Sequence, residues 1–238
     1  MIRNYYLFFI IINSLLFNSI PGICQSITKS CGNKISAQDT INENQMLYNG
    51  RIWRNYFPMI MENQFLFSKE LLPASVTMRG KTFSDIRIKY NIFTDEIITP
   101  FAPAGMLQLN KQMVDSFYLI FQNKKYHFIR ITDSTSSLSG GYYNVVYKGK
   151  TTLYARYSKK IEKLADKDEF DRFYQTNRVY IIQEGKVVNI PGKKDLFRAL
   201  DVHKKEVRQF MRDSNIKISI EDPFTLVPFL RFIDDKKE

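Results

Sequence analysis

The chain has 238 residues and a formal net charge of +11, with 35 lysine and arginine residues against 24 acidic ones. It contains two cysteines, Cys24 and Cys31, which are too few for a disulfide framework or a cysteine-rich metal site. The fold must therefore be stabilised by its hydrophobic core, and the basic charge predicts either an anionic partner or a solvated basic surface.

The N-terminal segment has the features of a secretory signal peptide. Arg3 supplies a positive charge, and residues 5–17 form an uncharged apolar run that is too short to span a bilayer comfortably. A polar segment with small residues follows and favours cleavage between Cys24 and Gln25, which makes residues 1–24 the signal peptide. The alternative is lipoprotein processing, in which Cys24 is the acylated residue.

Cleavage at this point predicts an exported protein that is periplasmic or associated with the outer membrane. About 210 residues remain after cleavage, which is enough for one domain with a sizeable core. No later apolar run has transmembrane length, so we expect no transmembrane helix in the mature chain. Residues 25–45 are polar, and we expect them to be loose or partly helical.

Alternation of apolar and polar residues dominates residues 46–190 and predicts β-strands. Ile86, Ile88 and Tyr90 alternate with two basic residues, as expected for a strand with one face in water. Residues 117–121 are apolar at every position, which predicts a central strand that is buried on both faces.

Turn-forming residues recur between these runs, at Asn49–Gly50, Arg79–Gly80, Asn123–Lys124, residues 148–150 and Glu184–Gly185. Many short strands at close spacing, with few helical patterns between them, predict antiparallel strands arranged as a β-sandwich, barrel or half-barrel. The expected fold class is therefore mainly β, with a small C-terminal helical part formed by residues 191–238.

Helical periodicity replaces strand alternation in this C-terminal part. Two short amphipathic helices are expected around Leu196 and Phe210. Asp222 and Pro223 form an N-cap and first-turn signature for a third helix. Pro228 lies beyond that first turn and predicts that the third helix is kinked, short or absent. We expect the helices to pack on the sheet within one domain.

Asp95 and Glu96 are adjacent carboxylates beside aromatic and basic residues, which raises the question of an acid/base site. They lie between the strand that contains Tyr90 and the strand that contains Ile97, where the chain must reverse, and Asp favours turns. An acid/base pair needs two carboxyl groups at a controlled separation, whereas neighbours at a strand end point to opposite faces. As turn residues, their joint replacement by Asn and Gln should change the free energy of unfolding by at most about 1–2 kcal/mol.

No other pattern predicts catalytic, cofactor-binding or metal-binding residues. His127 and His203 have no neighbouring His, Cys or carboxylate at metal-ligand spacing. Nucleophile-elbow, phosphate-loop and dinucleotide-binding motifs are absent from the sequence. Trp53, the single tryptophan, is expected to anchor the core.

Residues 142–163 form a basic stretch with interleaved tyrosines. Its candidate anion-facing residues are Lys148, Lys150, Arg156, Lys159 and Lys160. In a cytoplasmic protein the pattern would indicate nucleic acid, but export leads us to expect no nucleic acid partner. The expected targets are anionic envelope lipid, lipopolysaccharide, acidic glycan or an envelope protein. The alternatives are a solvated strand face and an edge strand protected by lysines.

Several segments, among them "LYNGRIW", "FQNKKYHFIRI" and "LFRALDVHKKEVRQFMRDSNIKI", resemble a family of exported, uncharacterised proteins of Bacteroidota-type Gram-negative bacteria. The resemblance covers nearly the whole mature chain. It implies a periplasmic or outer-membrane-associated location, and it supplies no catalytic residues that could be transferred to this sequence.

The expected function is that of a non-enzymatic envelope protein that binds a ligand or partner through its sheet. The alternatives are a structural or assembly factor of an envelope complex, and a hydrolase whose site is built from scattered residues. A ligand binder should show a cavity, an assembly factor an exposed apolar patch, and an enzyme a cleft with converging polar groups.

Overall fold

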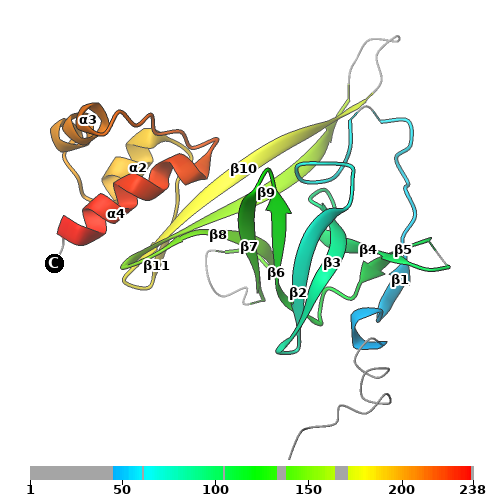
Figure 1. Ribbon diagram of the computed structural model, residues 1–238. Helices are drawn as coiled ribbons and strands as arrows, with labels where there is room; N and C mark the ends of the chain where they lie inside the picture. The colour runs from blue at the N-terminus through cyan, green and yellow to red at the C-terminus, as the bar shows by residue number, and fades with distance from the viewer. Residues whose placement is uncertain (1–44, 61, 104, 133–137, 164–170, 237–238) are drawn as a thin grey trace, which may run out of the picture. The chain divides into compact units, whose positions relative to one another are not determined.

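The computed structural model describes residues 45–60, 62–103, 105–132, 138–163 and 171–236, and within them eleven strands form one sheet (Figure 1). All neighbouring strands in the sheet are antiparallel. The expected signal peptide, its expected cleavage residues Cys24 and Gln25, and residues 25–44 lie outside the described residues.

The strands are β1 (Gly50–Ile52), β2 (Leu72–Met78), β3 (Lys81–Asn91), β4 (Glu96–Phe101), β5 (Gly105–Leu109), β6 (Val114–Phe121), β7 (Lys124–Ile131), β8 (Gly141–Lys148), β9 (Thr151–Glu162), β10 (Arg172–Gln183) and β11 (Lys186–Asn189). Their order in the sheet is β1-β5-β4-β3-β2-β6-β7-β8-β9-β10-β11. The chain enters at one edge, crosses to the middle at β2 and returns outward to β5. It then continues from β6 to the opposite edge.

The sheet curves around a core of aromatic side chains. Phe117 of β6 stacks on Phe128 of β7 at 4.7 Å between ring centroids, and the ring of Tyr90 lies 5.1 Å from that of Phe117. The curvature brings β9 back to the turn after β3, where the Lys159 N–H donates to the Ile92 carbonyl over 3.1 Å. The predicted mainly β, antiparallel fold is therefore confirmed. Because the sheet is curved but not closed, the half-barrel is the one of the three expected arrangements that describes it.

Three of the expected tight turns have the left-handed backbone that hairpins require. Positive φ angles occur at Arg79 (48°) and Gly80 (80°), at Gln122 and Asn123, and at Glu184 and Gly185. The second of these turns lies one residue earlier than expected, because Lys124 already begins β7. Residues 148–150 also connect two paired strands, β8 and β9. The fifth expected turn is wrong, because Gly50 begins β1, which pairs with β5 rather than with the strand that follows it.

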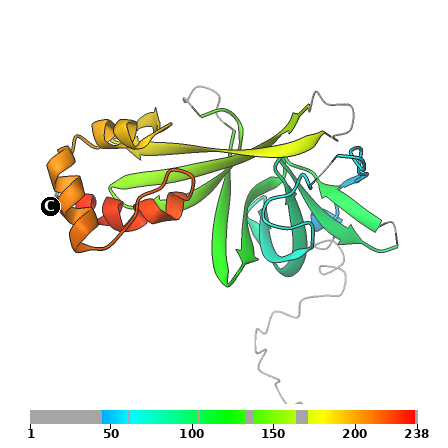
Figure 2. The same cartoon turned by 90° about the horizontal axis from the view of Figure 1, so that it is seen from above.

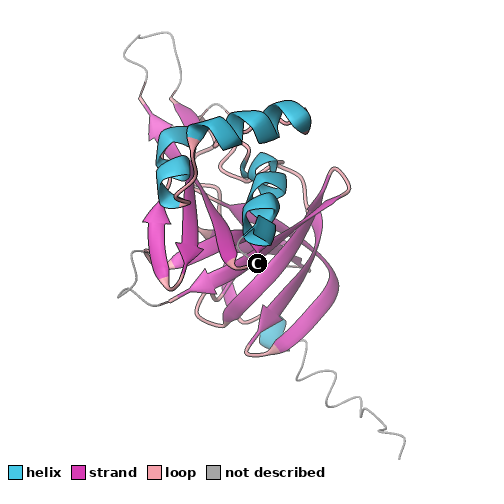
Figure 3. Cartoon of the chain, turned by 90° about the vertical axis from the view of Figure 1, so that its left-hand side faces the viewer, coloured by secondary structure: helices cyan, strands magenta, loops and turns pink. Residues whose placement is uncertain are grey.

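Helices α2 (Lys193–Ala199), α3 (Lys204–Asp213) and α4 (Val227–Lys236), with the short 3-10 helix η2 (Pro223–Leu226), follow the sheet. Figure 3 shows them gathered on one side of it. A second core joins the helices to the strands, because Leu196, Phe229 and Leu230 are buried in one cluster with Leu153 and Val179. The expected packing of the helical part on the sheet is therefore observed.

Pro228 divides the third helical segment into two elements. The Asp222 carboxylate caps η2 by accepting a hydrogen bond from the Phe224 N–H over 3.2 Å. A new α-helix begins at Val227, which places Pro228 in its first turn, where the missing N–H of proline costs nothing. The segment is helical on both sides of Val227, with a change of helix type at that residue.

Asp234 of α4 ties the helical part to the β8–β9 hairpin. Its side chain is 6% exposed, and its Oδ2 accepts hydrogen bonds from the Tyr147 hydroxyl over 3.0 Å and from the Thr151 N–H over 3.1 Å. A side chain at Gly149 would collide with this carboxylate, because its Cβ would lie 2.3 Å from Asp234 Oδ2.

We expect Asp234→Ala to lower the free energy of unfolding by about 2–3 kcal/mol, because it leaves the partly buried Tyr147 hydroxyl and the buried Thr151 N–H without their charged acceptor. Urea unfolding measures the change. Asp235→Ala is the matched control, since Asp235 is exposed and should give a change of less than about 0.5 kcal/mol. Equal effects of the two substitutions would contradict the proposed anchoring role.

Candidate functional site

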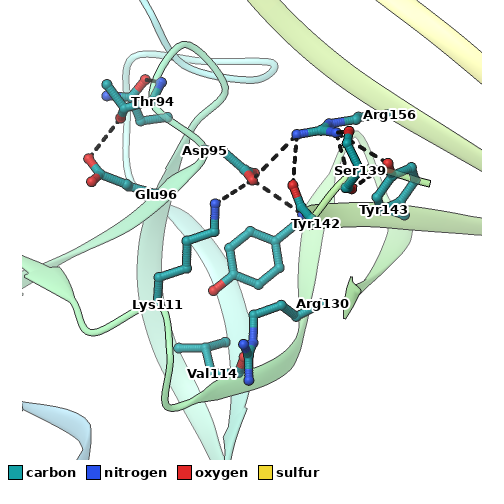
Figure 4. A network of polar contacts seen from close by, with 12 residues as sticks. Thr94, Asp95, Glu96, Lys111, Val114, Arg130, Ser139, Tyr142, Tyr143 and Arg156 are labelled. Atoms are coloured by element: carbon teal, nitrogen blue, oxygen red, sulfur yellow. Dashed lines mark hydrogen bonds and ion pairs between the residues drawn. The ribbon is translucent and has the colours of Figure 1, made fainter. Parts of the chain in front are cut away.

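Asp95 is the centre of a polar network that connects three strands and two turns (Figure 4). Its Oδ1 accepts the Tyr90 hydroxyl over 2.6 Å, and its Oδ2 lies 2.6 Å from Lys111 Nζ and 4.0 Å from Arg156 Nη2. The Tyr142 N–H also donates to Oδ2, over 3.3 Å. The carboxylate therefore connects the turn after β3 to β8 and β9, and these contacts give it a structural role beyond that of a turn residue.

Glu96 points to a different set of partners. Its carboxylate accepts hydrogen bonds from the Thr94 hydroxyl over 2.8 Å, from Arg51 Nη2 over 3.2 Å, and from the amide of Gln108. The location of both residues at a strand reversal is confirmed, because β3 ends at Asn91 and β4 begins at Glu96. The two carboxylates face separate networks, so the geometry does not form an acid/base pair.

Gly141 allows Asp95 and Arg156 to approach each other. It has a φ of +147°, and a Cβ at this position would lie 2.6 Å from Asp95 Oδ2 and 2.7 Å from Arg156 Nη2. No larger residue fits without moving one of the two charged groups. Arg156 continues past the glycine to donate to the Gly140 carbonyl over 3.1 Å and to the Tyr143 hydroxyl over 3.2 Å.

The structure distributes the five candidate anion-facing residues over three places. Lys148 and Lys150 lie at the β8–β9 hairpin, where Lys150 Nζ donates to the Asp234 carbonyl over 3.3 Å. Lys159 is half-buried on the inner face of β9, and its Nζ donates to the Phe65 carbonyl over 3.0 Å. Burial lowers the pKa of Lys159. Arg156 and Lys160 alone share the outer face of β9.

The neighbouring strand completes a basic surface on that outer face. In the β9–β10 register Arg156 lies directly opposite Arg178, and Lys160 lies directly opposite Tyr174. Between these two pairs the Ser158 and Thr176 hydroxyls are 2.8 Å apart. We call these six residues the basic face. Figures 1 and 2 show β9 and β10 as a long paired ribbon.

Two of the cations on the basic face lack a counter-ion among the described residues. Arg178 and Lys160 are exposed, and neither makes an ion pair or side-chain hydrogen bond with any residue that the structure describes. Further along the ribbon, Glu162 is held by Arg172 at 2.7 Å. Like charges directly opposite each other in a sheet are destabilising, so the Arg156–Arg178 pair lowers the stability of the free protein.

Arg178 was missing from the sequence-based candidates because it lies outside residues 142–163. The signal that could have found it is the hairpin register, since β9 and β10 are twelve residues each and pair along their full length. Once the strands are aligned, alternate residues of β10 fall beside those of β9.

Neither histidine belongs to a metal-binding arrangement. The ring of His127 stacks on that of Tyr118 with 4.3 Å between centroids, and burial together with the charges of Lys125 and Lys148 lowers its pKa. His203 is the exposed residue before α3. Across the part of the chain that the structure describes, no group of three or more His, Cys, Asp or Glu side chains could hold a metal ion.

Residues within 53–60 and 62–65 line a pocket with a volume of about 460 Å³. Lys89 of β3 and Phe173 of β10 also line it. Trp53 lines this pocket and is half-buried, so the prediction that it anchors the core is wrong. The physical reason is that β1 is an edge strand, exposed at all three of its residues, and the chain leaves the sheet directly after it.

Comparison with protein-family models, curated proteins and solved structures found no match. Among the described residues, no helix has the length and the apolar composition needed to cross a membrane.

Proposed function

We propose that this chain is an exported cell-envelope protein that binds phosphate-bearing anionic components of the envelope through the basic face, without catalysing a reaction. The export part of the proposal is supported by the charged and apolar segments at the N-terminus. The observation that carries the binding part is the cross-strand pair of Arg156 and Arg178.

The arginine pair is arranged for an anionic ligand rather than for the stability of the free protein. Arg156 is held by Tyr143, Gly140 and the more distant Asp95, whereas Arg178 is exposed and lacks a described counter-ion. A guanidinium group binds phosphate through two parallel hydrogen bonds, so an arginine fixed beside a free one suits a phosphate group.

The rest of the basic face fits an envelope surface. Lys160 adds a further exposed cation, and Tyr174 is 54% exposed beside it. Tyrosine rings next to cations are favoured at membrane interfaces, where the apolar ring and the polar hydroxyl meet different surroundings. Each basic residue near an anionic surface contributes about 1 kcal/mol of attraction.

Co-sedimentation with vesicles tests the proposal. We expect the protein to bind phosphatidylglycerol vesicles at low salt and not phosphatidylcholine vesicles, and to be released as salt approaches the physiological concentration, where charges are screened over about 8 Å. The double variant Lys160→Glu/Arg178→Glu should bind at least about tenfold more weakly, because two attractive charges become repulsive.

Lys205→Glu/Arg208→Glu on α3 is the matched control. Both residues are exposed and the change in net charge is identical, so this variant should retain most of the binding. Lipopolysaccharide in place of phosphatidylglycerol identifies the source of the phosphate. Absence of binding to both at low salt, or equal loss in the two double variants, would overturn a site on the basic face.

A further inference from the structure

The pocket lined by Trp53 is separate from the basic face, because its β10 residue is Phe173, on the face of the strand opposite to Tyr174. Four aromatic side chains shape it. The ring of Trp53 lies 5.9 Å from that of Phe65, and Phe57 meets the ring of Phe173 edge-on at 5.9 Å. Its volume of about 460 Å³ is in the range of small-molecule sites, which is about 300–1,000 Å³.

Buried amides hold the walls of the pocket in place. Gln64 is 4% exposed and Asn91 is 1% exposed, and Asn91 Nδ2 donates to Gln64 Oε1 over 2.9 Å. Gln64 Nε2 donates in turn to Asn55 Oδ1 over 3.1 Å. The backbone N–H of Trp53 donates to the Met106 carbonyl over 2.8 Å. These bonds fix the segment before any ligand arrives, which lowers the entropy cost of binding.

The rim of the pocket carries charged groups of both signs. Glu62, Lys69 and Glu70 are exposed pocket residues, and none of them makes an ion pair with a described residue. Glu62 also has a φ of 65°, a left-handed conformation that is uncommon for a residue other than glycine. A strained backbone at a ligand-sized pocket is typical of functional positions.

This combination of groups selects one ligand chemistry. An acyl chain would fill the aromatic walls but leave the carboxylates and amines at the rim without partners. For a phosphate group, repulsion by Glu62 and Glu70 would offset the attraction of the two pocket lysines. A sugar ring has an apolar C–H face and hydroxyl edges that both donate and accept hydrogen bonds. The aromatic walls match the C–H face of the sugar, and the charged rim matches its hydroxyl edges.

We propose that the Trp53 pocket binds an oligosaccharide. The proposal does not depend on anion binding by the basic face, and it assigns Trp53, Phe57 and Phe173 to contact with the sugar rings. Glu62 and Glu70 accept hydrogen bonds from the sugar hydroxyls.

Tryptophan fluorescence tests the proposal directly, because Trp53 is the single tryptophan of the chain. The probes are maltotriose, cellotriose and tri-N-acetylglucosamine, with tri-alanine as a peptide probe. We expect a saturable change in Trp53 emission with at least one trisaccharide. The double variant Glu62→Gln/Glu70→Gln should weaken that binding by about tenfold, the usual effect of losing hydrogen bonds to a charged acceptor.

Two controls separate the pocket from other surfaces. Tyr56 is 78% exposed in the same segment and does not line the pocket, so Tyr56→Ala should leave saccharide binding unchanged. Lys160→Glu/Arg178→Glu should also leave it unchanged, whatever its effect on vesicles. No saturable change with any of the three saccharides, or binding of tri-alanine alone, would overturn the proposal.

Discussion

The protein is expected to lose stability steeply above pH 10, at a rate of about 4 kcal/mol per pH unit, because three buried tyrosines resist ionisation. Burial, reinforced by the charge of Asp95, raises the pKa of Tyr90 and that of Tyr142 well above the ordinary value of 10.0. Burial also raises the pKa of Tyr157 to about 12.

The sign of the effect follows from the protons bound in each state. Below pH 10 the three hydroxyls are protonated in both states, and their contribution to stability does not change with pH. Above pH 10 the unfolded chain releases these protons while the folded protein keeps them, so stability falls until the folded pKa values are reached. Each group contributes about 1.4 kcal/mol per pH unit in that window.

Urea unfolding at a series of alkaline pH values measures this slope, and Tyr142→Phe is the informative variant. The Tyr142 hydroxyl is buried without a hydrogen-bond partner among the described residues. Its removal should therefore leave stability unchanged or increase it near neutral pH, and should reduce the alkaline slope by about one third. An unchanged slope in this variant would contradict the role assigned to the buried hydroxyl.

Asp95→Asn is expected to lower the free energy of unfolding by about 2–3 kcal/mol, because the network of Tyr90, Lys111 and Arg156 loses its central charge. The side chain of Asp95 is 18% exposed, which places it between a surface ion pair and a buried one. This cost exceeds the change of at most about 1–2 kcal/mol that is expected for turn residues.

Glu96→Gln is the matched control for this substitution. Glu96 has the same side-chain exposure of 18%, but its charged partner Arg51 is 74% exposed, and exposed pairs contribute about 0–1 kcal/mol. The neighbouring substitutions should therefore differ by at least about 1 kcal/mol in chemical denaturation. Equal effects would mean that Asp95 contributes no more to stability than an ordinary turn residue.

Local features of the fold were predictable because short-range physics determines them. The turns at Arg79–Gly80 and Glu184–Gly185 need left-handed backbone, which Gly80 and Gly185 adopt without strain. Residues 117–121 were correctly assigned to a central strand, since β6 is the sixth of eleven strands in the sheet. Burial on both faces was wrong, because Ile120 is 42% exposed and no described layer covers it.

Features that depend on distant residues were not predictable. The contact of Asp95 with Lys111 and Arg156 results from the curvature of the whole sheet, which sequence periodicity does not encode. The pairing of Arg156 with Arg178 depends on the register of a long hairpin. Residue composition alone therefore identified a basic stretch but not the face on which its charges meet.

Hydrogen exchange with vesicles present tests the central claim, binding through the basic face, most directly. Residues 172–178 of β10 pair with β9 on one side only, because β11 covers just Tyr180–Gln183, so their outward amides should exchange quickly in the free protein. On phosphatidylglycerol vesicles we expect slower exchange in residues 172–178 and 154–160, with α3 unchanged. Protection confined to the helices or to the Trp53 pocket would contradict the assignment of anion binding to the basic face.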